Sequence, residues 1–295
     1  MGSAIHPHSG SRGRSVPSMS STTLADFLLP HGFSMPHPAA VLRETSAATE
    51  LGRYVARAAT DRRARREAPY TARVPRHGEP VLLVPGFLAG DGTLGLLSRS
   101  LRAEGFRTYR SHIFSNIGCT LNAAAQLESR LEAIAARRGS RVQIVGHSLG
   151  GMLARGVAVR RPDLVSNIVT MGSPMLAPGA HHVSLATVLD VLVRLSRAGV
   201  PGLMSVDCVQ GECARQSFDD ARRPVPDGVG FTAIYSQRDG IVDWRACVDP
   251  LARAVEVTAS HLGMAFDPRV ADAVNAALLR PSAGSAVEVD RGESA

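Results

Sequence analysis

The sequence predicts an α/β fold, in which a mostly parallel sheet carries helices on both faces and an inserted lid. Apolar, β-branched runs alternate with helix-like segments from about residue 78 to 282. One of these runs ends in a Gly-x-Ser-x-Gly motif and passes directly into a helix-like segment. Hydrophobic residues make up 44% of the 295-residue chain, which is enough for a sizeable core.

The expected elements follow one another in a regular order. Strands are predicted at residues 81–84, 107–113, 142–147, 165–171, 231–235 and from Val255 onward, and helices at about 93–104, 120–138, 152–161 and from Pro268 onward. Because parallel strands end at the same edge of a sheet, residues that follow successive strands are expected to meet there.

The Gly-x-Ser-x-Gly motif makes Ser148 the candidate nucleophile. A strand runs into Ser148 and a helix leaves it, so the turn must be tight and its hydroxyl exposed above the sheet. Such a turn has room only for small residues two positions before and after the serine, where Gly146 and Gly150 stand. A glycine-rich turn with an incidental serine is the alternative.

A serine nucleophile needs a base, and the base needs an orienting acid. His261, in a loop just past the last predicted strand, is the expected base, because His181 and His182 come too early and suit a loop or lid. Asp239, in the turn after the strand ending at Tyr235, is the expected acid. Asp243 is its rival, although it also suits the N-cap of the stretch from Trp244.

Two backbone N–H groups should face the charge that develops on the substrate oxygen. Leu149 follows the nucleophile and supplies one, and Phe87, in the glycine-rich loop after the first strand, supplies the other. An ordinary strand-to-helix turn is the alternative for this loop. Gly90 and Gly92 also resemble a phosphate-binding loop, but no Gly-Lys-Ser/Thr follows them.

With these motifs the chain resembles the α/β-hydrolase superfamily, and within it the compact bacterial lipase and esterase branch. Gly172-Ser173-Pro174 is similar to the Gly-Ser-Pro of bacterial triacylglycerol lipases, whereas Pro85-Gly86 stands where many relatives have His-Gly. The resemblance implies an α/β-hydrolase fold over residues 78–282 and ester hydrolysis through an acyl-enzyme. It does not fix the substrate, because one fold and one triad serve many chemistries.

An insertion at about 174–228 is longer than one connecting helix requires, and an amphipathic helix is predicted within it from His182 to Ala198. We expect a lid over the site, which would suit a lipid-like acyl chain. A helix packed on the sheet without a gating role is the alternative.

Outside the catalytic domain, residues 1–38 and a tail at 283–295 are expected to be disordered. Residues 39–77 form a basic helical extension, with an apolar face and four arginines at its end: Arg62, Arg63, Arg65 and Arg66. This helix could contact an anionic membrane surface or simply pack on the hydrolase body. With no apolar signal region, a cytoplasmic location, with peripheral membrane contact left open, is expected.

Nucleic acid is not an expected partner. The isoelectric point is near 10.0, but every one of the 33 basic residues is arginine, which is typical of a GC-rich genome. Aromatic residues are only 4% of the chain, too few for stacking sites.

The four cysteines suggest no cofactor or metal site, because they are not grouped closely enough along the chain. Cys208 and Cys213 are close enough in sequence to bridge, and Cys119 and Cys247 are buried thiols or a second pair.

The sequence therefore predicts a cofactor-independent serine hydrolase that acts on carboxylic esters of small molecules or lipids. An acyltransferase or a thioesterase with the same triad is an alternative. A non-catalytic binding protein of the same fold is a third possibility, which an intact Ser, Asp and His in the right order disfavours.

Overall fold

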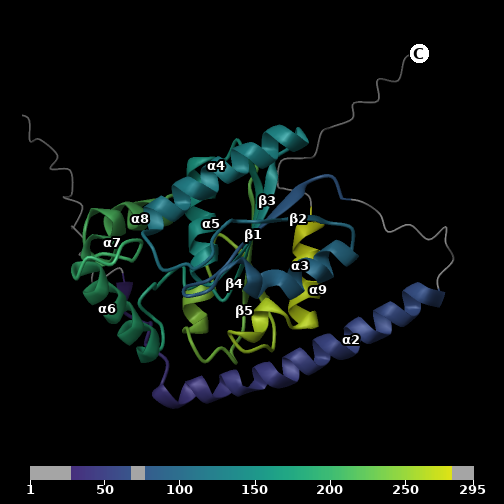
Figure 1. Cartoon of the computed structure of the whole chain (residues 1–295), viewed down its shortest axis with the longest axis horizontal. Coiled ribbons are helices and arrows are strands. Elements are labelled where there is room, and N and C mark those ends of the chain that lie inside the picture. Colours follow the sequence, from purple (N-terminus) through teal and green to yellow (C-terminus); the bar gives the residue numbers. More distant parts are fainter. Residues whose placement is uncertain (1–27, 68–76, 281–295) are drawn as a thin grey trace, which may run out of the picture.

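A computed structural model describes residues 28–67 and 77–280, and Figure 1 shows a central sheet flanked by helices. The sheet has six strands in the order β2-β1-β3-β4-β5-β6, and every neighbouring pair is parallel. The strands are β1 (Pro80–Val84), β2 (Arg107–Arg110), β3 (Val142–His147), β4 (Val165–Met171), β5 (Gly230–Tyr235) and β6 (Arg253–Glu256). The predicted α/β fold with a parallel sheet is confirmed.

Helices cover both faces of the sheet. Alternate residues of a strand point to opposite faces, so a central strand packs against helices on both sides. Val81 and Leu83 of β1 pack with α3 (Gly95–Ala103) and α9 (Pro268–Leu278) in one core cluster. Leu82 and Val84 pack with α4 (Thr120–Arg138) and α5 (Leu149–Arg160) in a second cluster. Short 3₁₀ helices lie between these elements: η2 (Asp91–Leu94), η3 (Trp244–Cys247) and η4 (Gly263–Ala265).

Two strands differ from their predicted bounds by more than one residue. β2 ends at Arg110 and not at Ile113, because the Asp91 carboxylate accepts hydrogen bonds from the N–H groups of Ser111 and His112 and turns the chain away. β6 begins before Val255 and ends at Glu256, so the residues up to His261 form a loop and not a longer strand.

The chain before the sheet forms η1 (Pro38–Ser46) and the long helix α2 (Ala47–Glu67), which runs beside α9 and η4 (Figure 1). Tyr54 is buried in this contact, and Arg53 forms an ion pair with Asp267, Nη2–Oδ2 3.0 Å. The apolar face predicted for the extension includes Val41 in η1 and Leu51 and Val55 in α2, and all three side chains are instead exposed. The helix packs through polar groups and Tyr54.

The prediction of disorder for residues 1–38 is wrong for residues 28–38, which make defined contacts with the rest of the structure. The Leu28 carbonyl accepts a hydrogen bond from Gly179, Phe33 packs on a buried cluster that includes Ala246, and His37 caps η1. These contacts fix the segment against the body. Residues 1–27, 68–76 and 281–295, including the predicted tail, lie outside the described residues.

The insertion between β4 and β5 contains α6 (Val183–Arg197), α7 (Val206–Gln210) and α8 (Glu212–Arg222). The predicted amphipathic helix is therefore present as α6. α8 packs on α4 and α5, where the side chain of Arg160 pairs with Asp220. α6 buries only Leu192 within the helix, and it lies to one side of the sheet in Figure 1. A gating role for α6 stays a prediction.

The described helices contain no stretch that is both long and apolar enough to cross a membrane.

Candidate active site

Ser148 occupies the tight turn between β3 and α5. Its backbone has φ 52° and ψ −123°, a strained conformation that costs a non-glycine residue about 1–3 kcal/mol. The Ser148 N–H donates to the Met171 carbonyl at 2.8 Å, which holds the turn against the next strand. A Cβ at Gly146 would lie 2.5 Å from the Gly150 backbone, and one at Gly150 would collide with the Val84 carbonyl oxygen. The turn therefore excludes side chains at both glycines.

Asp239 and His261 meet in the loops that follow β5 and β6. His261 Nδ1 lies 2.7 Å from Asp239 Oδ2, while Asp239 Oδ1 accepts from the N–H groups of Ile241 and Val242 at 2.8 and 2.9 Å. The carboxylate only accepts, so Nδ1 carries the proton and Nε2 keeps a free lone pair. Both side chains are buried. This arrangement orients the imidazole as a base.

The pKa of His261 is raised above its ordinary value. Burial by itself lowers this pKa, but the charge of Asp239, its hydrogen bond and the charge of Glu44 together outweigh that effect. The imidazole therefore holds a proton more readily than a free histidine, which suits a group that must accept one.

The elbow and the imidazole lie against each other. The rings of His147 and His261 have centroids 4.8 Å apart, and a Cβ at Gly172 would lie 3.1 Å from His261 Nδ1. Within the described chain, no hydrogen bond joins Ser148 Oγ to His261. Such bonds are often long in free enzymes and tighten when substrate binds. Ser148, Asp239 and His261 thus gather at the carboxyl edge of the sheet.

Asp243, the rival acid, lies in the next turn and serves as the N-cap of η3, where it accepts from the Arg245 N–H at 3.1 Å. His181 and His182 lie at the start of the insertion, and His182 caps α6. Within the described contacts of these three residues, none reaches the imidazole of His261.

His147 lies directly before Ser148 in the elbow and contacts the loop that carries the base. The sequence analysis did not predict this contact. Its Nε2–H donates to the His261 carbonyl at 3.0 Å. Burial, together with repulsion from His261, lowers the pKa of His147 to about 3, so the ring is neutral near pH 7. A neutral ring holds the base without competing for its proton.

Glu44 binds both loops that carry the acid and the base, and sequence reasoning did not identify it. Its Oε1 accepts from the N–H groups of Gly240 at 2.9 Å and His261 at 3.0 Å, and its Oε2 accepts from Leu262 at 2.8 Å. The side chain is buried, so these bonds are shielded from water. The N-terminal extension is therefore part of the site's framework.

Glu50, in the first turn of α2, makes a second contact of the same kind. It accepts from Ser260 N–H at 2.9 Å and from Ser260 Oγ at 2.6 Å. In the sequence these glutamates are simply acidic residues near the start of an extension that ends in arginines, and nothing there indicates their partners.

The loop after β1 reaches the nucleophile. A Cβ at Gly86 would lie 3.1 Å from Ser148 Cβ, and Asn116 Nδ2 donates to the Pro85 carbonyl at 3.0 Å, which fixes the loop. Leu149 is the first residue of α5, where an N–H has no helical partner. Within the described chain, the N–H groups of Phe87 and Leu149 donate no hydrogen bond to protein.

A small apolar pocket of about 80 Å³ opens beside Leu149. It lies between α4, α5 and α8, and its apolar lining includes Leu121, Met152 and Met175. Three large apolar side chains are exposed on loops of the site or loops that contact it. They are Leu88, Phe114 (95% exposed) and Leu262.

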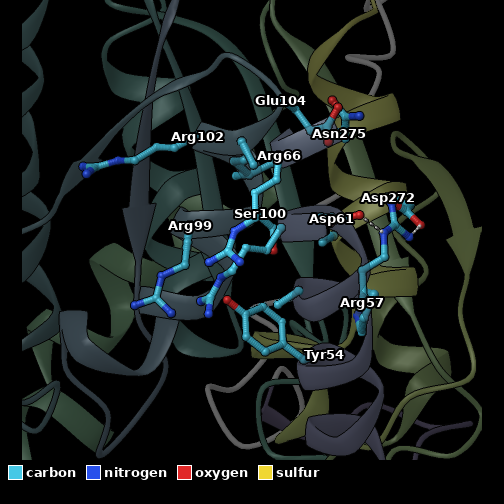
Figure 2. Close-up of a pocket in the computed structure, with 16 residues that line it drawn as sticks. Tyr54, Arg57, Asp61, Arg66, Arg99, Ser100, Arg102, Glu104, Asp272 and Asn275 are labelled. Atoms are coloured by element: carbon cyan, nitrogen blue, oxygen red, sulfur yellow. Dashed lines mark hydrogen bonds and ion pairs between the residues drawn. The ribbon is translucent and has the colours of Figure 1, made fainter. Parts of the chain in front are cut away.

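A separate pocket of about 570 Å³ lies between α2, α3 and α9 and shares none of its lining with the site (Figure 2). Arg57 on one side pairs with Asp272, Nη1–Oδ2 3.2 Å. Arg66 and Arg99 lie on the other side, without a carboxylate partner among the described residues. This part of the surface is therefore basic.

Neither disulfide that the sequence left open, Cys208–Cys213 or Cys119–Cys247, is formed in the structure. All four cysteines are free thiols, and Cys119 lies beside Cys213, with their Sγ atoms 3.7 Å apart. Cys208 joins these two, and Cys247 is buried elsewhere. Spacing along the chain did not predict this group, because Cys119 comes from a different part of the fold.

Comparisons with known proteins agree with the architecture. A family model described as a PGAP1-like alpha/beta domain matches residues 121–198. A triacylglycerol lipase from Vibrio cholerae serotype O1 is 31% identical over 99 residues, which is 32% of this chain and 31% of the lipase. The chain thus matches about a third of that relative's length.

Solved structures of a Bacillus licheniformis lipase, BlEst2, share the fold. The mature form superposes with a TM-score of 0.55 at 13% identity, covering 71% of this chain and 95% of that one. The propeptide form has the same TM-score at 14% identity and is covered over 52% of its length. With its parallel sheet and strand-to-helix elbow, this chain has the α/β-hydrolase fold.

Proposed function

We propose that this protein is a serine hydrolase that cleaves carboxylic esters through an acyl-enzyme. The observation that carries the proposal is the buried Asp239–His261 pair, 2.7 Å apart, beside the strained elbow at Ser148. A buried carboxylate that fixes one imidazole nitrogen leaves the other free to take a proton from a serine.

In the proposed reaction, Ser148 Oγ attacks the ester carbonyl as His261 Nε2 takes the hydroxyl proton. Asp239 holds the imidazole in the productive tautomer and stabilises the imidazolium that forms. His261 then gives the proton to the leaving alcohol. Water next attacks the acyl-enzyme with His261 again acting as base, and Ser148 is released.

The negative charge on the carbonyl oxygen would be held by the N–H groups of Phe87 and Leu149. Support comes from the position of Gly86 against Ser148 and from the start of α5 directly after it. In a site shielded from water, loss of one such donor typically costs about 2.7–4 kcal/mol of transition-state stabilisation.

A lipid-type ester is the substrate class that these surroundings favour. The pocket beside Leu149 is lined mainly by apolar side chains, and Leu88, Phe114 and Leu262 expose apolar surface around the site. The similarity to a protein named triacylglycerol lipase supports the same class. An apolar rim would also help the enzyme to meet substrate at a lipid–water interface.

The same residues would serve an acyltransferase or a thioesterase. In those reactions an acceptor alcohol replaces water, or a thiol leaves in place of an alcohol, while the roles of Ser148 and His261 are unchanged. An acyltransferase of this kind would need the buried site to exclude water from the acyl-enzyme.

The test is hydrolysis of p-nitrophenyl esters from two to sixteen carbons, with Ser148→Ala as the control. We expect turnover by the wild type and none above background by the variant, with both proteins equally folded by circular dichroism. A fluorophosphonate should label Ser148 in the wild type. Labelling without hydrolysis of any ester would point to an acyltransferase or thioesterase, and turnover by Ser148→Ala would overturn the assignment.

We also propose that the outer face of α2 contacts an anionic lipid surface. Leu51 and Val55 are exposed on this helix, and Arg62, Arg63 and Arg66 follow them toward its end. Apolar side chains beside arginines are typical of helices that lie at a membrane surface. Flotation with phosphatidylglycerol vesicles should decrease in Leu51→Asp/Val55→Asp, and equal binding by both proteins would refute the contact.

A further inference from the structure

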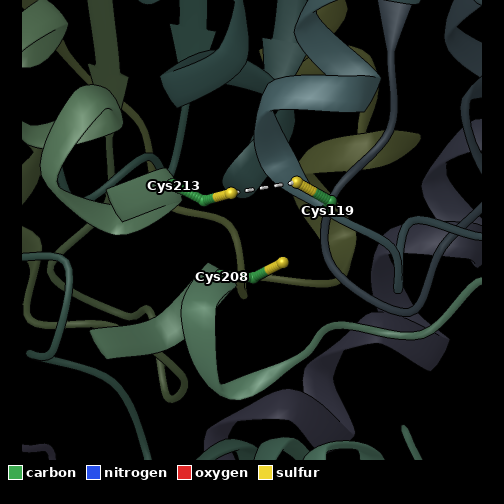
Figure 3. A group of neighbouring side chains, drawn as sticks. All are labelled: Cys119, Cys208 and Cys213. Carbon is green, nitrogen blue, oxygen red and sulfur yellow. Dashed lines mark hydrogen bonds between the residues drawn. The ribbon is translucent and has the colours of Figure 1, made fainter. Parts of the chain in front are cut away.

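Three of the four cysteines come together from separate segments of the fold (Figure 3). Cys119 precedes α4, Cys208 lies in α7 and Cys213 lies in α8. Their Sγ atoms all lie within 4.8 Å of one another, and those of Cys119 and Cys213 are 3.7 Å apart. The group therefore joins the helical insertion to the first turn of a helix that covers the sheet.

The spacing of these sulfur atoms suits a shared metal ion. A zinc ion binds thiolates at about 2.3 Å, so two sulfur atoms of a tetrahedral site lie roughly 3.8 Å apart. The Cys119–Cys213 separation matches that edge, and a shift of Cys208 by roughly 1 Å would complete a three-sulfur face. A disulfide would use only two of the three thiols.

A carboxylate beside Cys213 would supply the fourth ligand after a shift toward the other two thiols, since it is not part of the group whose atoms all lie within 4.8 Å. Asp207 Oδ2 lies 3.0 Å from Cys213 Sγ, while Asp207 Oδ1 accepts from the Glu212 N–H at 2.8 Å at the start of α8. The carboxylate, which lies in α7, is thus oriented by the N–H at the start of α8 and presents its other oxygen to the Cys213 thiol. Cys119 is the N-cap residue of α4, where the N–H groups of the first turn favour a thiolate.

We propose that Cys119, Cys208, Cys213 and Asp207 form a structural site for a soft divalent cation, with Zn²⁺ as the best fit. Three sulfur ligands select zinc over magnesium or calcium, which prefer oxygen. Four protein ligands leave no open position, so the role is structural. The ion would fasten α7 and α8 to the start of α4, and binding would release the thiol protons to solvent.

The metal content of the full chain tests this site. The protein would be produced with added zinc, purified without a metal-affinity step under reducing conditions, and compared with Cys208→Ser and Cys247→Ala. We expect one zinc per chain in the wild type and in Cys247→Ala, and less than a tenth of that in Cys208→Ser. Zinc held adventitiously by the N-terminal histidines would be the same in all three proteins, because each of them has these histidines. Equal zinc content in the three proteins would therefore overturn the proposal.

Cys208→Ser also separates the metal site from a disulfide. A Cys119–Cys213 bond would survive this substitution and would lower the free-thiol count of the denatured wild type, whereas a metal site leaves every thiol titratable. Co²⁺ added to the zinc-free protein should give the absorption bands of tetrahedral thiolate coordination. A zinc-free wild type without these bands, or with a Cys119–Cys213 disulfide, would refute the proposal.

Discussion

Glu44 lies outside the predicted catalytic domain, yet its carboxylate accepts three backbone N–H groups from the loops that carry Asp239 and His261. We expect Glu44→Ala to destabilise the protein strongly, because it leaves three buried donors without a partner. A hydrogen bond to a charged group contributes about 1.5–3 kcal/mol, and water entering the gap would restore part of the loss. The expected cost is therefore about 4 kcal/mol.

That cost is large beside a typical total stability of about 5–15 kcal/mol. For a domain of this size it corresponds to a fall in Tm of roughly 10 °C. Glu44→Gln keeps one acceptor oxygen and the same shape, so we expect about 1–2 kcal/mol for this variant. Glu67→Gln is the matched control, because Glu67 lies on the same extension but its side chain is 66% exposed. It should change stability by less than about 0.5 kcal/mol.

Glu44→Gln should also change the pH dependence of catalysis. The charge of Glu44 raises the pKa of His261, and the base must be neutral to act, so kcat/KM rises as pH increases through that pKa. Removing the charge lowers the pKa of His261, and the rising limb should move to lower pH. Kinetics of a p-nitrophenyl ester from pH 5 to 9 and thermal unfolding measure both effects. An unchanged limb together with an unchanged Tm would refute the role given to Glu44.

Three further predictions concern the site itself. Asp239→Asn should lower kcat for ester hydrolysis by about 10⁴-fold, because the amide favours the wrong tautomer of His261. Asp243→Asn should lower kcat by less than about tenfold. Equal losses in the two variants would mean that Asp239 is not the acid. His147→Ala should lower kcat by roughly 10-fold with little change in KM. His147→Gln should retain part of the wild-type kcat, because its amide can donate to the same His261 carbonyl. Equal kcat values in the two variants would mean that the ring acts only by packing. Met152→Trp should fill the pocket beside Leu149 and reduce turnover of medium-chain esters relative to acetate, and an unchanged chain-length profile would exclude this pocket as the acyl site.

The strands, the helices and the elbow were predictable because their signals are local. The alternation of apolar runs with helix-like segments places six parallel strands in order, and the steric demands of a tight turn explain Gly146 and Gly150. Asp239 and His261 were candidates for the same reason, since each follows a recognisable strand. Their hydrogen bond is consistent with the predicted pairing.

The face of α2 that packs on the body was not predictable from periodicity. Leu51 and Val55 have the spacing of a buried stripe, but they are exposed, and Glu50 and Tyr54 are buried in their place. The Glu50 carboxylate can face the interior here because Ser260 supplies two donors to it, in addition to the Ser46 hydroxyl. Those donors belong to a distant loop, so the helix sequence alone favours the wrong face.

By itself, then, the sequence determined the elements, their order and the residue types that chemistry requires at the ends of the strands. Only the tertiary structure decided that Glu44 holds the loop of His261, 217 positions further along the chain, and that Cys119 meets Cys213. The physical reason is that strands, helices and turns are encoded by neighbours within a few residues. A buried charge or a thiol group finds its partners across the whole fold, and no local pattern records them.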